Sequence, residues 1–217
     1  MLIECKNNDE WLLERSKGIG GSDASSILGL NPYKSNVELW REKTGRTKTK
    51  DISHKPYVLY GKQAEEHLRK LFELDYPEYE VAYIPYNIHI HKDYNYLRAS
   101  LDGELLHKQT LEKGIFEAKT TEIRKKTDWT NWDKKIPMNY FCQILHYFIV
   151  KTDCSFAKLK AQIKSHDLSG ETILTTKHYH IERENHKNDI EMLLNKEIEF
   201  WWYVQNDKAP PLILPEI

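Results

Sequence analysis

The sequence reads Leu97-Arg98-Ala99-Ser100-Leu101-Asp102-Gly103-Glu104 and, further on, Gly114-Ile115-Phe116-Glu117-Ala118-Lys119-Thr120, two segments that predict neighbouring strands. Asp102 stands at the end of the first strand, and Glu117 and Lys119 stand late in the second. Because side chains alternate between the faces of a strand, Glu117 and Lys119 point the same way. Two carboxylates suit a hard divalent cation such as Mg2+, and a lysine beside them can orient water or neutralise a phosphate. The pattern therefore predicts metal-dependent phosphodiester chemistry.

A solvated strand face with an ordinary Glu–Lys pair is the alternative explanation, and such a pair contributes roughly a few tenths of a kcal/mol. The apolar Ile115 and Phe116 and the small Ala118 instead favour a strand that is buried on at least one face. A charged pair at the end of a buried strand requires a function, so these neighbours support the chemical interpretation.

The composition predicts a folded protein with one compact domain. The chain has 217 residues, of which 40% are hydrophobic and 12% aromatic, enough for a sizeable core. The formal net charge of −1 argues against nucleic-acid binding driven by the protein's overall electrostatic field. A locally basic cleft is nevertheless compatible with this net charge. Three cysteines without a paired spacing indicate reduced thiols. Without a membrane-length apolar segment or a signal peptide, a cytoplasmic protein is expected.

Hydrophobic periodicity predicts an α+β fold: a mixed central β-sheet flanked by helices, a helical N-terminal segment and a long C-terminal helix. Asp9, Ser22 and Ser35 are the expected N-caps of the first three helices, and residues 18–21 are an expected flexible turn. The predicted helices cover about 11–15, 22–28, 37–45, 57–74, 138–151 and 184–205, and the strands, a meander first, cover about 81–83, 88–90, 96–99, 101–106, 115–119, 156–163 and 172–181.

Four more residues are candidates for the site. Glu65 lies on the 57–74 helix near its apolar face, where a solvated acid is the alternative, and Gln143 interrupts an apolar run, where a buried amide paired with backbone is the alternative. Arg15 and Ser22 flank the glycine-rich turn. The Ser22 hydroxyl, helix N–H groups and Arg15 could bind a phosphate together, or Ser22 could be a plain N-cap.

Taken in order, these motifs resemble the lambda-type phage exonuclease family, also called YqaJ-like viral recombinases, of the PD-(D/E)xK nuclease superfamily. The resemblance covers roughly residues 11 to 150. Two positions depart from the pattern: Leu101 replaces the proline that names the superfamily, and Leu145 replaces a polar residue. The motifs that carry the resemblance are Trp11-Leu12-Leu13-Glu14-Arg15, Gly18-Ile19-Gly20-Gly21-Ser22-Asp23-Ala24, Gly61-Lys62-Gln63-Ala64-Glu65, Ser100-Leu101-Asp102-Gly103, Glu117-Ala118-Lys119 and Tyr140-Phe141-Cys142-Gln143.

The resemblance implies roles for these residues within a restriction-endonuclease-like fold, with residues 1–217 forming a single PD-(D/E)xK exonuclease domain. Lys119 positions or activates the attacking water, Gln143 orients Lys119 or that water, and Arg15 with Ser22 binds the 5′-phosphate of DNA. The implied catalytic residues are Asp102, Glu117, Lys119 and Gln143, and the implied ligands of Mg2+, for which Mn2+ would substitute, are Asp102, Glu117, Glu65 and the carbonyl of Ala118.

The implied activity is a 5′→3′ exonuclease on double-stranded DNA ends that leaves 3′ single-stranded tails for phage-type homologous recombination. A single-strand annealing protein is an implied partner, a homo-oligomer in the form of a ring-shaped trimer is the implied assembly, and a phage or prophage in a bacterial host is the implied source. An endonuclease or Cas4-like nuclease on the same fold, or a catalytically silent DNA-binding or scaffold protein, are the alternatives. The three cysteines do not provide the four ligands of a Cas4-type iron–sulfur cluster.

Some further residues have two explanations each. His89 and His91, like His178 and His180, are expected to be exposed strand histidines rather than zinc ligands. The basic runs Arg124-Lys125-Lys126 and Lys134-Lys135 either contact a phosphate backbone or form a solvated loop, and Trp129 and Trp132 either stack on bases or pack under that loop. Phe200, Trp201, Trp202 and Tyr203 are expected to pack in the core or, second, at a subunit interface.

Overall fold

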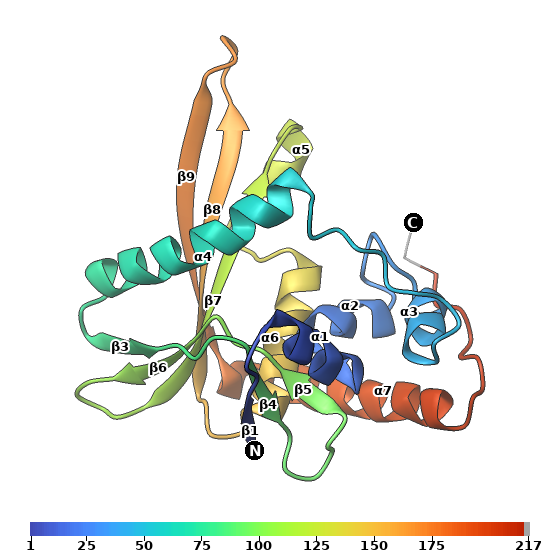
Figure 1. The fold of residues 1–217 in the computed structure, drawn as a ribbon. Helices are drawn as coiled ribbons and strands as arrows, with labels where there is room; N and C mark the ends of the chain where they lie inside the picture. The colour runs from blue at the N-terminus through green and yellow to red at the C-terminus, as the bar shows by residue number, and fades with distance from the viewer. Residues whose placement is uncertain (215–217) are drawn as a thin grey trace.

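The computed structural model describes residues 1–214, apart from the side chains of Lys126 and Thr127, so the predicted role of Lys126 lies outside the described residues. Two β-sheets are surrounded by helices, which confirms the predicted α+β class with mixed strands, a helical N-terminal segment and a long C-terminal helix (Figure 1). The helices are α1 (Asn8–Ser16), α2 (Gly21–Ile27), α3 (Asn36–Lys43), α4 (Pro56–Asp75), α5 (Lys126–Trp129), α6 (Met138–Val150) and α7 (Lys187–Gln205), with a 3₁₀ turn η1 (Arg183–His186).

The strands divide between two sheets rather than one, and this differs from the predicted central sheet with its meander. The four-stranded sheet has the order β1 (Leu2–Glu4), β4 (Asn87–Ile90), β5 (Leu97–Ala99) and β2 (Ile19–Gly20). The five-stranded sheet has the order β3 (Tyr79–Ala82), β6 (Gly103–His107), β7 (Lys113–Glu122), β8 (Phe156–His166) and β9 (Thr172–Glu182). Strand β2 occupies the turn predicted to be flexible, where it pairs in parallel with β5.

The five-stranded sheet is mixed because β7 and β8 are parallel while the other neighbours are antiparallel. A parallel pair needs a crossover connection, and the segment that contains α6 supplies it. Helix α6 is an apolar run whose residues from Ile144 to Val150 are all buried, so it lies against the sheet rather than in solvent.

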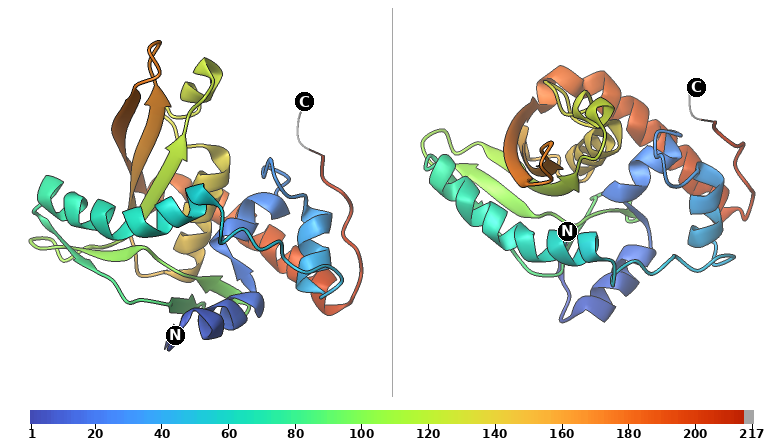
Figure 2. Two further views of the ribbon diagram at one scale, coloured as in Figure 1. Left: turned by 45° about the horizontal axis from the view of Figure 1, so that its top comes forward. Right: turned by 90° about the horizontal axis from the view of Figure 1, so that it is seen from above.

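Helices cover both faces of this sheet (Figure 2). On one face, Phe148 of α6 and Leu193 of α7 pack with Leu159 of β8 in the larger core cluster. On the other face, Phe72 of α4 packs against Phe116 of β7, with 4.9 Å between the ring centroids. The β8–β9 hairpin extends beyond these helices (Figure 1).

Strand β6 separates from β7 just where the predicted acidic residues occur. The last β6–β7 pair in this direction is Gly103 with Phe116, whereas β7 continues to Glu122 alongside β8. The chain before Gly103 crosses from the four-stranded sheet, where β5 ends at Ala99. An opening between the two sheets results, and Asp102 lies at its edge.

The helix starts differ partly from the prediction. Asn7 rather than Asp9 caps α1, since its side chain accepts a hydrogen bond from the Glu10 backbone N–H. Helix α2 begins at Gly21 with Gly20 as its N-cap, so the alternative that Ser22 is a plain N-cap is wrong. The Ser35 cap of α3 is confirmed.

Candidate active site

A cavity of about 610 Å³ opens between the two sheets, and every residue of the predicted site lies on its wall. The contributing elements come from widely separated parts of the chain: α1, α2, α4, the segment before β6, β7 and α6. The predicted residues on this wall are Arg15, Ser22, Glu65, Asp102, Glu117, Ala118, Lys119 and Gln143.

Asp102 is fixed to the neighbouring strand through the peptide of Ala118. The Ala118 backbone N–H donates to Asp102 Oδ2 at 2.9 Å, and the Arg69 guanidinium donates to the Asp102 backbone carbonyl. This N–H would face β6 if the two strands stayed paired. Because β6 separates at Gly103, the Asp102 side chain receives the hydrogen bond instead.

Glu117 and Lys119 are two positions apart on β7 and form an ion pair inside the cavity. Lys119 Nζ lies 2.6 Å from Glu117 Oε1, and the Gln143 side-chain amide on α6 donates to the same oxygen at 2.8 Å. The Glu117 side chain is 1% exposed, which excludes the solvated-strand explanation. Its other oxygen, Oε2, is buried without a hydrogen-bond partner among the described residues. An unsatisfied buried carboxylate oxygen is costly, so it is expected to have a ligand in the working protein.

The carboxyl groups raise one another's pKa values. Burial, reinforced by the charge of Asp102, raises the pKa of Glu117 to about 8 and that of Glu65 to about 7. Burial also raises the pKa of Asp102, against the opposing charge of Lys119. The pKa of Lys119 lies above its ordinary value, because the charges of Glu117 and Asp102 outweigh burial. A bound cation would relieve this repulsion between carboxylates.

The residues fit a hard divalent cation. Among residues 1–214, no three His, Cys, Asp or Glu side chains lie close enough, as arranged here, to hold a metal ion by themselves. A magnesium-type ion needs only one or two carboxylates, because it retains several of its waters. Asp102, Glu117 with its unpartnered Oε2, and Glu65 line one cavity and provide this chemistry.

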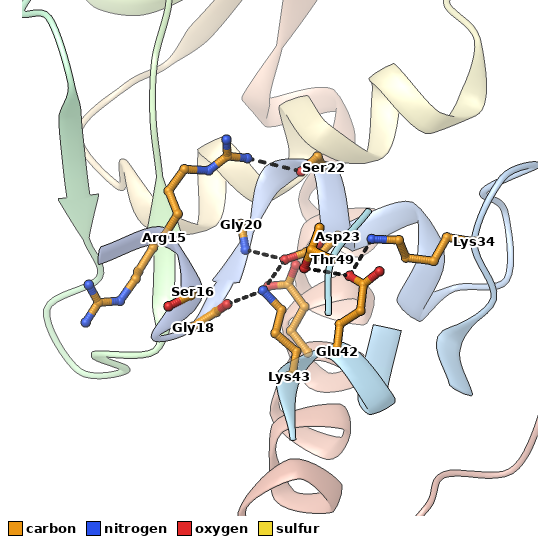
Figure 3. A network of polar contacts seen from close by, with 12 residues as sticks. Arg15, Ser16, Gly18, Gly20, Ser22, Asp23, Lys34, Glu42, Lys43 and Thr49 are labelled. Carbon is orange, nitrogen blue, oxygen red and sulfur yellow. Dashed lines mark hydrogen bonds and ion pairs between the residues drawn. The ribbon is translucent and has the colours of Figure 1, made fainter. Parts of the chain in front are cut away.

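Arg15 of α1 and Ser22 near the start of α2 line the same cavity and lie close together (Figure 3). Arg15 Nη2 donates to Ser22 Oγ at 3.4 Å. Within the described chain, Arg15 has no carboxylate at ion-pair distance, although its guanidinium lies 4.4 Å from the Trp11 ring centroid. Its charge is therefore available to an anion.

The turn before α2 is held by a buried ion pair. Asp23 accepts from the Gly20 backbone N–H at 3.0 Å and lies 2.7 Å from Lys43 Nζ, which also donates to the Gly18 carbonyl (Figure 3). Burial raises the pKa of Asp23, but the charge and hydrogen bond of Lys43, the Gly20 N–H and the charge of Arg15 together keep that pKa below its ordinary value. Gly21 permits close contact with α6, since a Cβ there would lie 2.9 Å from Gln143 Cγ and 2.7 Å from the Tyr147 ring. The turn is thus rigid rather than flexible.

Sequence reasoning missed three residues around this cavity. Tyr147 accepts a hydrogen bond from Gln143 Nε2 at 2.5 Å, and it follows Gln143 by four residues, a helical spacing that could have revealed it. Asn87 accepts from the Leu101 N–H and donates to the Leu101 carbonyl, at 2.9 and 3.0 Å. Arg69 holds the Asp102 carbonyl. Neither Asn87 nor Arg69 lies in a sequence pattern that indicates a site residue.

The remaining predicted residues lie elsewhere. The expectation that His89 and His91 are exposed is wrong, because they are 7% and 8% exposed. His89 lies 3.5 Å from Glu104 of β6, and the His91 ring lies against Tyr94. His178 and His180 are exposed on the outer strand β9, as predicted. Trp132 is 4% exposed and packs in the core with Trp129 against it, so these residues pack under the loop that carries the basic runs. Phe200 is in the core, as expected, and Trp201 and Tyr203 pack against it, but the core expectation is wrong for Trp202, which is 48% exposed.

The fold is that of phage-type and alkaline exonucleases of known structure. An alkaline exonuclease from Laribacter hongkongensis superposes with a TM-score of 0.68 at 15% identity, covering 92% of this chain and 94% of that chain. Its complex with dAMP gives a TM-score of 0.58 at 16% identity, over 92% and 95%. A phage-related exonuclease from Haemophilus somnus 129PT gives 0.55 at 14% identity, over 87% and 94%.

This chain belongs to the YqaJ-like viral recombinase family, whose family model matches residues 10–155. It is 36% identical over 203 residues to the uncharacterized protein YqaJ of Bacillus subtilis (strain 168), covering 94% of this chain. The chain spans 57% of the length of that relative. The predicted family is therefore confirmed. Within residues 1–214, none of the helices combines the length and the apolar character needed to span a bilayer.

Proposed function

We propose that this protein is a divalent-metal-dependent deoxyribonuclease that acts as a 5′→3′ exonuclease on double-stranded DNA ends. The observation that supports it best is one cavity lined by three carboxyl groups of raised pKa, by Lys119 and by Arg15, which has no acidic partner in the described chain. A Glu–Lys pair on a solvent-exposed strand face, the alternative explanation, would not have these raised carboxyl pKa values. Residues 1–217 then form a single exonuclease domain.

Asp102, Glu117, Glu65 and the carbonyl of Ala118 would hold the cation, with Mg2+ proposed and Mn2+ as a substitute. When bound, such an ion lowers the pKa of a coordinated water and neutralises charge on the phosphate. Lys119, whose pKa is raised by the charges of Glu117 and Asp102, would orient the attacking water and stabilise developing charge by donating hydrogen bonds. Gln143 holds Glu117 Oε1, and Oε2, which has no partner among the described residues, would be available to the cation.

Arg15 and Ser22 would bind the terminal 5′-phosphate. A guanidinium offers paired N–H donors that match phosphate oxygens, and the Ser22 hydroxyl adds another donor. A fixed terminal phosphate at one end of the cavity sets which phosphodiester bond reaches Asp102. Recognition of this kind favours the release of nucleotides from the 5′ end. It leaves a 3′ single strand, which an annealing partner would use in recombination.

We infer a homo-oligomer, with a ring-shaped trimer as the specific arrangement, and a cytoplasmic phage or prophage protein in a bacterial host. Relatives named as exonucleases support DNA ends as the substrate class.

The test is digestion of end-labelled linear and circular duplex DNA with and without Mg2+. The proposal expects Mg2+-dependent loss of linear DNA only, abolished in Asp102→Asn and Lys119→Ala and retained in the control Asp93→Asn, a largely exposed aspartate outside the cavity. Circular dichroism checks that each variant folds. Cleavage of circular DNA would indicate an endonuclease, and binding without cleavage would indicate a silent scaffold.

A further inference from the structure

The segment between β3 and β4 presents aromatic surface inside the cavity. Tyr83 and Tyr86 both lie on the cavity wall, and they are 41% and 40% exposed. Pro85, between them, lies on the same wall. Aromatic rings usually bury most of their surface, and rings left accessible in a pocket are typical of ligand contacts. The proposed roles of the charged residues leave this surface without a function.

Tyr83 is supported from one side by an arginine. The Arg69 guanidinium carbon lies 3.6 Å from the Tyr83 ring centroid, which places the cation against one ring face. Arg69 also donates to the backbone carbonyl of Asp102. One side chain therefore connects the aromatic ring with Asp102, the acidic residue just before β6.

Tyr86 is held in a backbone conformation that favours glycine. Its φ is +54°, in the left-handed region, which is unusual for a tyrosine. The Cys5 backbone N–H donates to the Tyr86 carbonyl at 3.2 Å, and Asn87, directly after it, is clamped to Leu101. Such conformations persist where the surroundings hold them, and they concentrate at ligand-binding sites. Here the result is a second ring fixed on the cavity wall.

We propose that Tyr83 and Tyr86 form a stacking subsite for an unpaired nucleobase that adjoins the scissile phosphate. This inference rests on the proposed function and adds the substrate form that the site takes. Every base has a flat π-face, so aromatic stacking binds any sequence. Inside a duplex, neighbouring pairs cover both faces of a base, and only the outer face of the terminal pair is free. The proposed subsite holds a base that has left its pair, so the terminal pair opens before cleavage, and Arg69, which contacts both Tyr83 and the Asp102 carbonyl, places that base beside Asp102.

The direct test uses 2-aminopurine, whose fluorescence falls when it stacks. A 5′-phosphorylated duplex with two unpaired 5′-terminal nucleotides carries this base at the first or, separately, the second nucleotide, so that the free probe is not already quenched by duplex stacking. It binds the full-length protein in EDTA, where no cleavage interferes. Anisotropy of a distant 3′ label measures binding separately. We expect bound DNA to lose fluorescence several-fold at one of these positions with the wild type and with Tyr83→Phe. Bound DNA without quenching at either position would overturn the inference.

Variants identify the rings responsible. Tyr83→Leu, Tyr86→Leu and their combination should restore fluorescence in the bound DNA, whereas Tyr33→Leu should not. Tyr33 is the matched control because it is 89% exposed and lies between α2 and α3, outside the cavity lining. Quenching that persists in the folded double variant would assign the stacking to other residues and overturn the proposal.

Kinetics separate this inference from the proposed function. Duplex ends with an abasic analogue at the stacked position should raise KM about 10-fold in the wild type and cause little further change in Tyr83→Leu, since that variant has already lost the contact. Wild-type cleavage with no response to the analogue would overturn the inference and leave the proposed function standing. Quenching without cleavage of any DNA at any Mg2+ concentration would support the stacking subsite and overturn the nuclease.

Discussion

Gln143 on α6 and Glu117 on β7 are joined by a hydrogen bond of 2.8 Å between the amide Nε2 and the carboxylate Oε1. The same nitrogen donates to the Tyr147 hydroxyl at 2.5 Å, which fixes the amide in place. Lys119 approaches the same carboxylate oxygen at 2.6 Å. One oxygen of Glu117 thus receives two donors, and the other is left for a ligand.

Gln143→Leu should lower the apparent affinity for Mg2+ in the proposed hydrolysis. Without the amide, Glu117 is free to turn, and loss of a residue that orients a ligand typically costs about 10–100-fold in metal affinity or activity. Initial rates measured against Mg2+ concentration should show the half-saturation point moving upward by about that factor. Gln63→Leu, an exposed glutamine on α4, is the control and should leave the curve unchanged. An unaltered curve for Gln143→Leu would show that Glu117 needs no such support.

The stability of the metal-free protein should decrease as pH rises. Burial raises the pKa of Glu117 from 4.5 to about 8 and that of Glu65 to about 7, so the folded state keeps protons that the unfolded state releases. Where the folded state binds more protons, the free energy of unfolding falls with increasing pH, here between about 4.5 and 8. Bound Mg2+ replaces those protons, so its stabilising effect should grow over the same interval.

Thermal unfolding in EDTA and in Mg2+, at several pH values across that interval, measures both effects. We expect the increase in melting temperature on adding Mg2+ to be larger at the alkaline end. Glu117→Gln should flatten the pH dependence in EDTA, because the variant has no titrating group at this position. A Mg2+ effect that is equal at all pH values would contradict a site built from these carboxyl groups.

Arg15→Ala should remove the preference for 5′-phosphorylated over 5′-hydroxyl DNA ends. The guanidinium lies beside Ser22 and has no acidic partner in the described chain, so its proposed ligand is the terminal phosphate. Competition between the two kinds of end for each variant measures the preference directly. Arg41→Ala, an exposed residue of α3, serves as the control. An equal loss on both substrates would mean that Arg15 binds DNA without recognising its terminus.

Local patterns predicted the parts of this structure that depend on neighbouring residues. Alternation along β7 correctly placed Glu117 and Lys119 on one side, and helical spacing located α4, α6 and α7. The division into two sheets was not predictable, because it depends on pairings between distant segments, such as Leu2 of β1 with His89 of β4. His89 was expected to be exposed, and it is buried because its side chain faces Glu104 of β6, a strand of the other sheet.

The candidate site was predictable only where its residues form motifs. Asp102, Glu117 and Lys119 were found from strand patterns, but the separation of β6 from β7 that opens the cavity appears only in three dimensions. Asn87 carried no signal, since its function is to pair with the backbone of Leu101. Residues that position others through the backbone have no characteristic spacing.

Asn87→Ala should impair hydrolysis more than its effect on folding explains. Its side chain makes two hydrogen bonds to Leu101, the residue before Asp102, and so holds the segment that crosses between the sheets. Asn36 is a matched control, because its side chain also makes two hydrogen bonds to backbone groups. It donates to the Pro211 carbonyl and accepts from the Ile213 N–H, which holds the C-terminal segment. Both variants should lose stability by about 1–3 kcal/mol in urea denaturation. Only Asn87→Ala should raise the Mg2+ concentration needed for half-maximal rate, and the same increase in Asn36→Ala would assign the effect to general destabilisation.

His146 on α6 should be charged in the folded protein, and this charge should depend on Glu197 of α7. Its Nδ1 lies 2.7 Å from Glu197 Oε1 and its Nε2 lies 2.9 Å from the Arg98 carbonyl, and both side chains are fully buried. Two acceptors require two ring protons, which only the imidazolium has. Although burial lowers it, the pKa of His146 is raised overall by the charge of Glu197, its hydrogen bonds and the more distant Asp23.

Removing Glu197 would leave this imidazolium buried without its partner. Loss of one member of a buried pair typically costs about 3–5 kcal/mol, so Glu197→Ala should lower the free energy of unfolding by that amount near pH 6. Glu199→Ala, a half-exposed neighbour on α7, should change it by less than about 0.5 kcal/mol. A raised histidine pKa gives stability that is complete below pH 6.5 and lost as pH rises through the folded-state value. The difference between the wild type and Glu197→Ala in urea denaturation should therefore shrink at alkaline pH, and a constant difference would show that His146 is neutral.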